Sequence, residues 1–242
     1  MDIIKGGFTN YGQAIGILML DTKFPRIPGD IGNALTYSFP VKYKIVKGAY
    51  CDKIMGSNID NSLLNSFILA AQELENEGCL AITTSCGFLA GFQRQLADSV
   101  NIPVFTSALT LVPFVWSIIN HNKSIGIFTE RASFMNEYHF NNVGWSSKNI
   151  PVNITGMPED SPFPKLFIGN QLEGNLNLLK GCMEEMTIRH MNTYKNTGAI
   201  VFECTNFGPF SKLVQDISGV PVFGINQLVE YINSCICIKR YY

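Results

Sequence analysis

The sequence has little charge, few histidines and no apolar run long enough to span a bilayer. Only 15% of its 242 residues are charged, the formal net charge is −1, and there are three histidines. Scattered and nearly balanced charge offers no electrostatic surface for nucleic acid or for an anionic membrane. The most apolar stretch, residues 108–119, is interrupted by Pro113 and falls far short of the ~20 residues that a bilayer requires. We therefore predict no nucleic-acid partner and no membrane partner.

The patterns typical of disulfide frames, zinc sites and secretion are also missing. The seven cysteines are an odd number without a Cys-x-x-Cys pair, and the start of the chain lacks the charged leader and cleavage site of a signal peptide. These features favour reduced thiols in a cytoplasmic protein that holds no metal. Five cysteines are interpreted as small buried hydrophobes: Cys51, Cys79, Cys182, Cys235 and Cys237. The histidines are interpreted as ordinary helix-face residues: His121, His139 and His190.

What the sequence does contain is an internal repeat. The segment AITTSCGFLAGF at 81–92 is similar in sequence to AIVFECTNFGPF at 199–210. A shift of 118 positions pairs Cys86 with Cys204 and continues without a gap to a Pro-Val-Phe in both copies. A register held for so long indicates two copies of one structural unit, each with a cysteine at the same place.

Short apolar runs alternate with segments of helical periodicity along the whole chain. Strands are expected at 14–20, 42–48, 79–85, 102–107, 124–130, 199–203 and 220–225. Helices are expected at 62–78, 88–100, 133–144 and 173–198 and from 226 onward, with a surface loop at 156–164. Alternation of this kind is typical of βαβ units and a parallel sheet.

We therefore predict an α/β protein with two pseudo-symmetric lobes, each with a mainly parallel central sheet flanked by helices. The first lobe is expected to comprise 1–108 plus 226–242, and the second 109–225. Ligands of parallel α/β sheets bind beyond the carboxyl ends of the strands. The predicted active site therefore lies in the cleft between the lobes.

Cys86 and Cys204 each follow a predicted strand and precede a predicted helix. A helix N-terminus lowers the pKa of a nearby thiol and can hold a carboxylate through its free amides. Two thiols facing each other could remove a proton from one face of a carbon and deliver a proton to the other face, which is racemisation. The amides expected to bind the substrate carboxylate follow the two cysteines, at Gly87, Phe88, Thr205 and Asn206.

On these residues the chain resembles the cofactor-independent aspartate/glutamate racemase superfamily, which includes hydantoin racemases and arylmalonate decarboxylases. The resemblance rests on IGIL in the first strand, TTSCGF, IGIFTERASF, FECTNF and the two PVF strands. It implies that Cys86 and Cys204 are the acid and the base, and that the Thr129 hydroxyl contributes to carboxylate binding. It also implies that no cofactor and no metal are used.

The chain departs from that pattern near both cysteines. The first family motif usually reads Cys-Asn-Thr, whereas Gly87 and Phe88 follow the cysteine here, so two polar side chains are missing. Glu203 immediately precedes the second cysteine, where it could tune the thiol; a carboxylate pointing to the surface is the favoured interpretation.

The loop at 21–39 is the other candidate for specificity, because it follows a strand end and is rich in Pro and Gly. Arg26 could hold a distal carboxylate in a bidentate pair, and Asn33 could hold a polar group. A solvated arginine and a turn asparagine are equally acceptable interpretations of these two residues.

The leading interpretation is a racemase or epimerase of an amino acid or a related carboxylate, working by two-thiol proton transfer without a cofactor. The alternatives are a one-thiol decarboxylase or cis–trans isomerase of the same fold, and a non-catalytic ligand-binding protein. The expected partner is a small carboxylate substrate, and a homodimer is left open.

Overall fold

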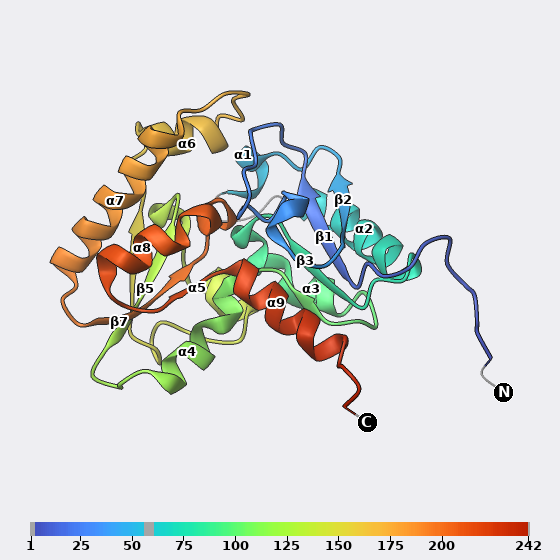
Figure 1. Cartoon of the computed structure of the whole chain (residues 1–242). Helices are drawn as coiled ribbons and strands as arrows, with labels where there is room; N and C mark the ends of the chain where they lie inside the picture. The colour runs from blue at the N-terminus through green and yellow to red at the C-terminus, as the bar shows by residue number, and fades with distance from the viewer. Residues whose placement is uncertain (1–2, 56–60, 242) are drawn as a thin grey trace.

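The chain folds into two lobes, each built on one four-stranded sheet whose strand pairs are all parallel (Figure 1). The structure is a computed structural model that describes residues 3–55 and 61–241. The strand orders are β2-β1-β3-β4 and β6-β5-β7-β8. The first sheet contains β1 (Ile15–Leu20), β2 (Val41–Val46), β3 (Ala81–Thr84) and β4 (Val104–Phe105). The second contains β5 (Ser124–Thr129), β6 (Val152–Gly156), β7 (Thr197–Phe202) and β8 (Val222–Phe223). The predicted two-lobed α/β fold is confirmed.

The internal repeat of the sequence is also a repeat of structure. The 3-10 helix η3 (Gly87–Phe92) follows β3, and η6 (Thr205–Phe210) follows β7 at the same offset of 118 positions. The last strands repeat as well, because Ile82 pairs with Val104 in the first sheet and Ile200 pairs with Val222 in the second. Both cysteines therefore leave equivalent strands of equivalent sheets.

The central strands are buried because helices cover the sheets. All residues of β1, β3 and β5 are buried, as expected for parallel strands covered on both faces. In the first lobe α2 (Leu64–Asn76) packs against β1 and β2. In the second lobe α7 (Leu176–Thr193) and α8 (Ser211–Ser218) pack against each other, as Figure 1 shows.

The remaining helices are short, apart from the last. They are α1 (Cys51–Ile54), α3 (Gln93–Ala97), α4 (Val112–Ile118), α5 (Glu137–Asn142), α6 (Pro162–Phe167) and α9 (Ile225–Ile236), with 3-10 turns at η1 (Ala34–Thr36), η2 (Asn61–Leu63), η4 (Ala108–Leu111) and η5 (Ala132–Phe134). Helix α9 leaves the second sheet and contacts β3, η4 and η6. Within residues 3–55 and 61–241, no helix is both long enough and apolar enough to cross a membrane.

Four predicted segments differ in detail from the structure. The predicted helix 88–100 is the 3-10 helix η3 followed by the five-residue α3, since glycines weaken the α-helix at this point. The helix predicted at 133–144 begins only at Glu137, because Asn136 caps it there. The helix predicted at 173–198 is shortened to α7 by the Asn175 cap. The predicted loop 156–164 is wrong in part, since it includes the end of β6 and the start of α6.

Candidate active site

Cys86 and Cys204 line one cavity at the carboxyl ends of β3 and β7. The cavity is narrow, and about 20 Å³ of its volume is open to a water-sized molecule. Their exposed fractions are 9% and 7%, so both thiols are almost removed from solvent. The structure therefore brings together the two thiols that the sequence paired.

The predicted lowering of the thiol pKa values is wrong for this structure. Burial raises the pKa of Cys86 well above its usual value, and the Glu203 carboxyl raises it further. Burial also raises the pKa of Cys204, and the carboxyls of Glu130 and Glu203 add to that rise. The amides of Phe88 and Asn206 act in the opposite direction but are the smaller influence. The residues that follow the thiols form 3-10 helices, which lack the extended dipole of the α-helix that we predicted.

Two buried carboxyls share the cavity with the thiols. Glu130 follows β5 and Glu203 follows β7, with exposed fractions of 2% and 1%. The expectation that Glu203 points to the surface is therefore wrong. Sequence reasoning missed Glu130 altogether. Its signal was its place as the last residue of a predicted strand, at the edge of the sheet where ligands bind.

Each carboxyl is held by one hydrogen bond. The Cys204 thiol donates to Glu130 Oε2 at 3.6 Å, and the Thr129 hydroxyl donates to Glu203 Oε2 at 2.6 Å. Burial raises the pKa of Glu130 to about 8; the bond from the Cys204 thiol opposes this rise and the Glu203 carboxyl adds to it. Burial likewise raises the pKa of Glu203 to about 8, against the bond from Thr129. Both groups are mainly neutral acids at neutral pH.

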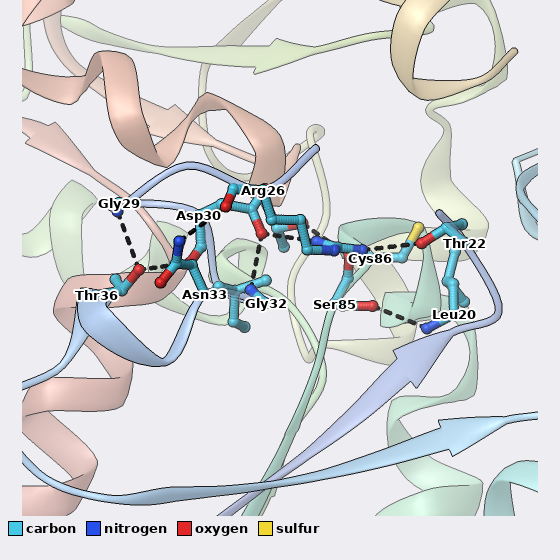
Figure 2. Close-up of polar contacts among 12 residues, drawn as sticks. Leu20, Thr22, Arg26, Gly29, Asp30, Gly32, Asn33, Thr36, Ser85 and Cys86 are labelled. Atoms are coloured by element: carbon cyan, nitrogen blue, oxygen red, sulfur yellow. Dashed lines mark hydrogen bonds and ion pairs between the residues drawn. The ribbon is translucent and has the colours of Figure 1, made fainter. Parts of the chain in front are cut away.

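Arg26 is the one cationic side chain among the described residues that line the cavity. It comes from the loop between β1 and β2, and its Nη1 donates to Asp30 Oδ1 at 2.7 Å while its Nη2 donates to Thr22 Oγ1 at 3.0 Å. Its guanidinium lies 4.4 Å from the centre of the Phe24 ring. Figure 2 shows the side chain extended between Asp30 and Thr22, with Cys86 beside it. Arg26 is therefore held in place before any ligand enters.

Two predicted ligand-binding side chains do not line the cavity. The Asn33 side chain accepts from the Leu35 amide at 2.9 Å and donates to the Arg26 carbonyl at 2.8 Å, so it shapes the loop (Figure 2). The Thr129 hydroxyl is completely buried and is engaged by Glu203. Asn33 thus supports the loop that carries Arg26, and Thr129 supports the side chain of Glu203.

The other predicted binding residues do line the cavity: Gly87, Phe88, Thr205 and Asn206. The Thr205 hydroxyl donates to the Ser85 carbonyl at 2.7 Å. The Phe88 ring packs edge-on against His139 at 5.2 Å between centroids. Asn206 Oδ1 is buried and has no hydrogen-bond partner in the described part of the chain.

Apolar side chains of the first lobe close the remaining wall: Leu20, Phe24, Cys51 and Met55. Cys51 was expected to be an ordinary core residue, but it adds a third thiol to the cavity, with a pKa that burial raises to about 12. Four more cysteines were interpreted as buried. Cys79 is buried, but Cys182 is half-buried and Cys235 and Cys237 are exposed, so the interpretation is wrong for these three. Within the described ranges, no three His, Cys, Asp or Glu side chains are arranged to hold a metal ion.

No family model matches the sequence. Among curated proteins, it is 27% identical over 215 residues to dimethylsulfoniopropionate lyase 6 of Emiliania huxleyi, covering 87% of this chain and 56% of the relative. It is also 25% identical over 216 residues to the dimethylsulfoniopropionate lyase of Durusdinium sp. clade D, covering 87% of this chain and 70% of the relative. The chain thus spans 56% and 70% of the lengths of these two lyases.

Similar solved structures include glutamate racemase from Francisella tularensis in complex with D-glutamate, with a TM-score of 0.57, 13% identity and coverage of 96% of this chain and 84% of that one. Allantoin racemase from Pseudomonas fluorescens has a TM-score of 0.57 and 13% sequence identity, and the match covers 93% of this chain and 91% of that one. Unliganded arylmalonate decarboxylase has a TM-score of 0.55 and 11% sequence identity, and the match covers 93% of each chain. The chain has the fold that these racemases and this decarboxylase share, and the two curated relatives are named dimethylsulfoniopropionate lyases.

Proposed function

We propose that this protein is a lyase that removes a proton from the carbon beside a carboxylate and expels a leaving group from the next carbon. The substrate we propose is dimethylsulfoniopropionate, which the sequence relatives are named for. The observation that carries the proposal is the presence of three thiols, one fixed guanidinium and two carboxyls in a single small cavity. Such a site offers a base for the proton and a cationic partner for the substrate carboxylate.

The charge pattern of the cavity matches a small zwitterion. Arg26 can pair with the substrate carboxylate, and the amides after the cysteines can add hydrogen bonds. The sulfonium group carries a positive charge on an apolar body, which suits the Phe88 ring. A cation next to a buried thiol lowers the pKa of that thiol, which opposes the rise caused by burial.

Cys86 is the thiol that we assign as the base. The Cys204 proton is held by its hydrogen bond to Glu130, whereas Cys86 makes no such bond to a carboxyl of the described residues; the amides of Phe88 and Asn206 favour the two thiolates alike. The Cys86 thiolate forms an S–H bond with the α-proton. The electron pair of the broken C–H bond becomes the new C=C bond, and the pair of the broken C–S bond leaves with dimethyl sulfide. Acrylate remains, and Cys86 then releases its proton to solvent.

The intermediate stage concentrates negative charge on the carboxylate, and this charge is what the site must stabilise. Donors that are fixed beforehand stabilise such charge more effectively than water does, because they do not need to reorient. The contacts of Arg26 to Asp30 and Thr22 supply this preorganisation. Closure of the cavity by apolar side chains strengthens the same interaction.

Racemisation or epimerisation is the second candidate, favoured by one observation. Both cysteines occupy equivalent positions in the two lobes and line the same cavity, as a proton transfer from one face to the other would need. An amino acid is also a zwitterion that would suit Arg26 and the carboxyls. The two candidates share the first step, and they differ in whether the deprotonated carbon expels a leaving group or accepts a new proton.

One pair of measurements separates the two candidates. We expect the purified chain to release dimethyl sulfide from dimethylsulfoniopropionate, detected by gas chromatography, with acrylate appearing in the proton NMR spectrum. Parallel incubation of amino acids in D₂O reports α-proton exchange. Exchange without dimethyl sulfide release would refute the lyase and support the racemase. Neither activity would refute both and leave a ligand-binding protein.

A further inference from the structure

Glu203 occupies space in the cavity that a side chain on Gly87 would otherwise fill. A Cβ atom built on Gly87 would lie 2.0 Å from the Glu203 carbonyl oxygen and 2.5 Å from Glu203 Oε1. The two residues come from different lobes and both line the cavity. Glycine at 87 therefore lets a carboxyl group of the second lobe reach the start of η3 in the first lobe.

The two oxygens of this carboxyl have different surroundings. Oε2 accepts the hydrogen bond from Thr129, whereas Oε1 is buried and has no hydrogen-bond partner among the described residues. An ionised carboxylate buried in this way would be costly, since Thr129 alone would compensate its charge. In the neutral acid, Oε2 is the carbonyl oxygen that accepts from Thr129, and the proton lies on Oε1. Oε1–H is then a donor that lacks an acceptor.

A buried donor without an acceptor indicates a ligand atom that would complete the pair. The proposed substrate offers carboxylate oxygens, and these gain negative charge as the α-proton leaves. Carboxylic acids that stay neutral in apolar sites are effective donors to such oxygens. Burial raises the pKa of Glu203 to about 8, consistent with a neutral acid at neutral pH.

We propose that Glu203 is a substrate-binding residue that donates a hydrogen bond from a neutral Oε1–H to the carboxylate of the ligand. The inference rests on the proposed function only in that the ligand is a small carboxylate. It assigns to Glu203 the polar contact that Gly87 cannot supply, and to Thr129 the positioning of Glu203 rather than direct contact with the ligand.

The proposal predicts how carboxylate binding depends on pH. Loss of the Glu203 proton places a negative charge against the ligand, so affinity falls as the pH rises through about 8. The other titratable or charged groups that line the cavity are Glu130, Cys51, Cys86, Cys204 and Arg26. Glu130 titrates in the same range, so part of the decline remains when Glu203 is replaced.

The test uses propionate as the probe and isothermal calorimetry on the whole chain at about pH 6.5 and about pH 9. The Glu203→Gln variant keeps an acceptor for Thr129 and a donor for the ligand. We expect it to bind propionate within about threefold of the unmodified protein at the lower pH and to lose less affinity at the higher pH. Glu203→Leu lacks the donor, and its affinity should fall by about tenfold or more at the lower pH.

Glu184→Gln, on the exposed side of α7, is the matched control and should bind like the unmodified protein. Circular dichroism of each variant confirms its folding. Equal loss in Glu203→Gln and Glu203→Leu would overturn the neutral-donor role, and unchanged affinity in both would overturn contact with the ligand. If the unmodified protein neither binds propionate nor cleaves dimethylsulfoniopropionate, the proposed function fails as well. If it cleaves that substrate while both Glu203 variants bind normally, the inference alone fails.

Discussion

The hydroxyl of Thr205 donates a 2.7 Å hydrogen bond to the carbonyl of Ser85, which joins the two lobes at the candidate active site. Ser85 immediately precedes one cavity cysteine and Thr205 immediately follows the other. The bond is buried, so neither group can exchange its partner for bulk water. It fixes the separation of the two thiol-bearing loops.

Removing this bond should lower activity more than stability. In Thr205→Val the Ser85 carbonyl loses its partner, which we expect to cost about 1–3 kcal/mol in the free energy of unfolding. The loops can then move apart, and small displacements of a catalytic group can lower turnover by about a hundredfold. Urea unfolding and dimethyl sulfide release measure the two effects. Thr205→Ser keeps the hydroxyl and should retain both properties; equal activity of the Val and Ser variants would contradict the role of the bond.

The cysteine variants separate elimination from racemisation. Elimination needs a base on one face of the substrate, so we expect Cys86→Ala to lower dimethyl sulfide release by at least about 10³-fold. Cys204→Ala should lower dimethyl sulfide release clearly less than Cys86→Ala does. Cys79→Ala, in the core of the first lobe, is the control for general effects of losing a buried thiol. Equal and complete loss of dimethyl sulfide release in both cavity variants would contradict the assignment of Cys86 as the sole base. α-Proton exchange that survives in each single variant while net racemisation is lost would favour the two-thiol racemase.

Arg26 should not be replaceable by lysine. Its guanidinium holds Asp30 and Thr22 with two separate nitrogens, which a single ammonium cannot do in the same geometry. We expect Arg26→Lys to raise the KM for dimethylsulfoniopropionate by about 10-fold to 100-fold, because a charge-assisted contact to the carboxylate is lost or misplaced. Lys23→Arg, in the same loop, is the control and should leave the KM unchanged. An unchanged KM in Arg26→Lys would remove Arg26 from the site.

Gly87→Ala should destabilise the protein far more than an alanine elsewhere. The added Cβ would overlap the Glu203 backbone at 2.0 Å, so the lobes must shift. We expect a loss of about 2–4 kcal/mol in the free energy of unfolding, together with loss of activity. At Gly181 in α7 the same Cβ meets no atom within 4 Å, and Gly181→Ala should gain up to about 1 kcal/mol. Similar unfolding curves for the two variants would refute the close packing at Gly87.

Stability should decline as the pH rises from about 6.5 to about 8. Burial raises the pKa of both Glu130 and Glu203 to about 8, so in this window the folded state holds protons that the unfolded state has lost. Unfolding is then linked to proton release, which becomes more favourable as the pH increases. The double variant Glu130→Gln/Glu203→Gln should show a flatter profile in urea titrations. The same decline in the double variant would exclude the two carboxyls as its cause.

Below about pH 6.5 the buried histidines act in the opposite direction. Burial lowers the pKa of His139 and of His190 to about 4, so the unfolded state takes up protons first and stability falls as the pH is lowered from 6.5 toward 4. In the unmodified protein the two glutamates offset much of this loss. In the Glu130→Gln/Glu203→Gln variant the free energy of unfolding should therefore fall visibly as the pH is lowered below 6.5. Adding His139→Leu to this variant should make that fall less steep. Exposed His121→Gln is the control.

The repeat predicted the fold and the placement of the cysteines because strand ends of parallel sheets are set by local pattern and topology. The same reasoning did not find Glu130, since a carboxylate after a strand is usually solvated, whereas this one is buried in a cavity that both lobes line. The helices predicted directly after the two cysteines are instead the 3-10 helices η3 and η6, and η6 contains Pro209. Strand β6 was missed because Asn153 interrupts a short edge segment that reads as a loop. Burial imposed by another lobe cannot be inferred from local sequence.

Ser85 and Glu203 occupy the same position in the two repeats, one residue before each cysteine. The Ser85 hydroxyl accepts from the Leu20 amide at 3.0 Å, while Glu203 extends across the cavity toward Gly87. Two thiols on opposite faces of a methylene group would each reach a different one of its two prochiral hydrogens. This divergence after duplication makes the halves unequal, so the pro-R and pro-S hydrogens meet different surroundings and a substrate without a stereocentre is still deprotonated from one chosen side.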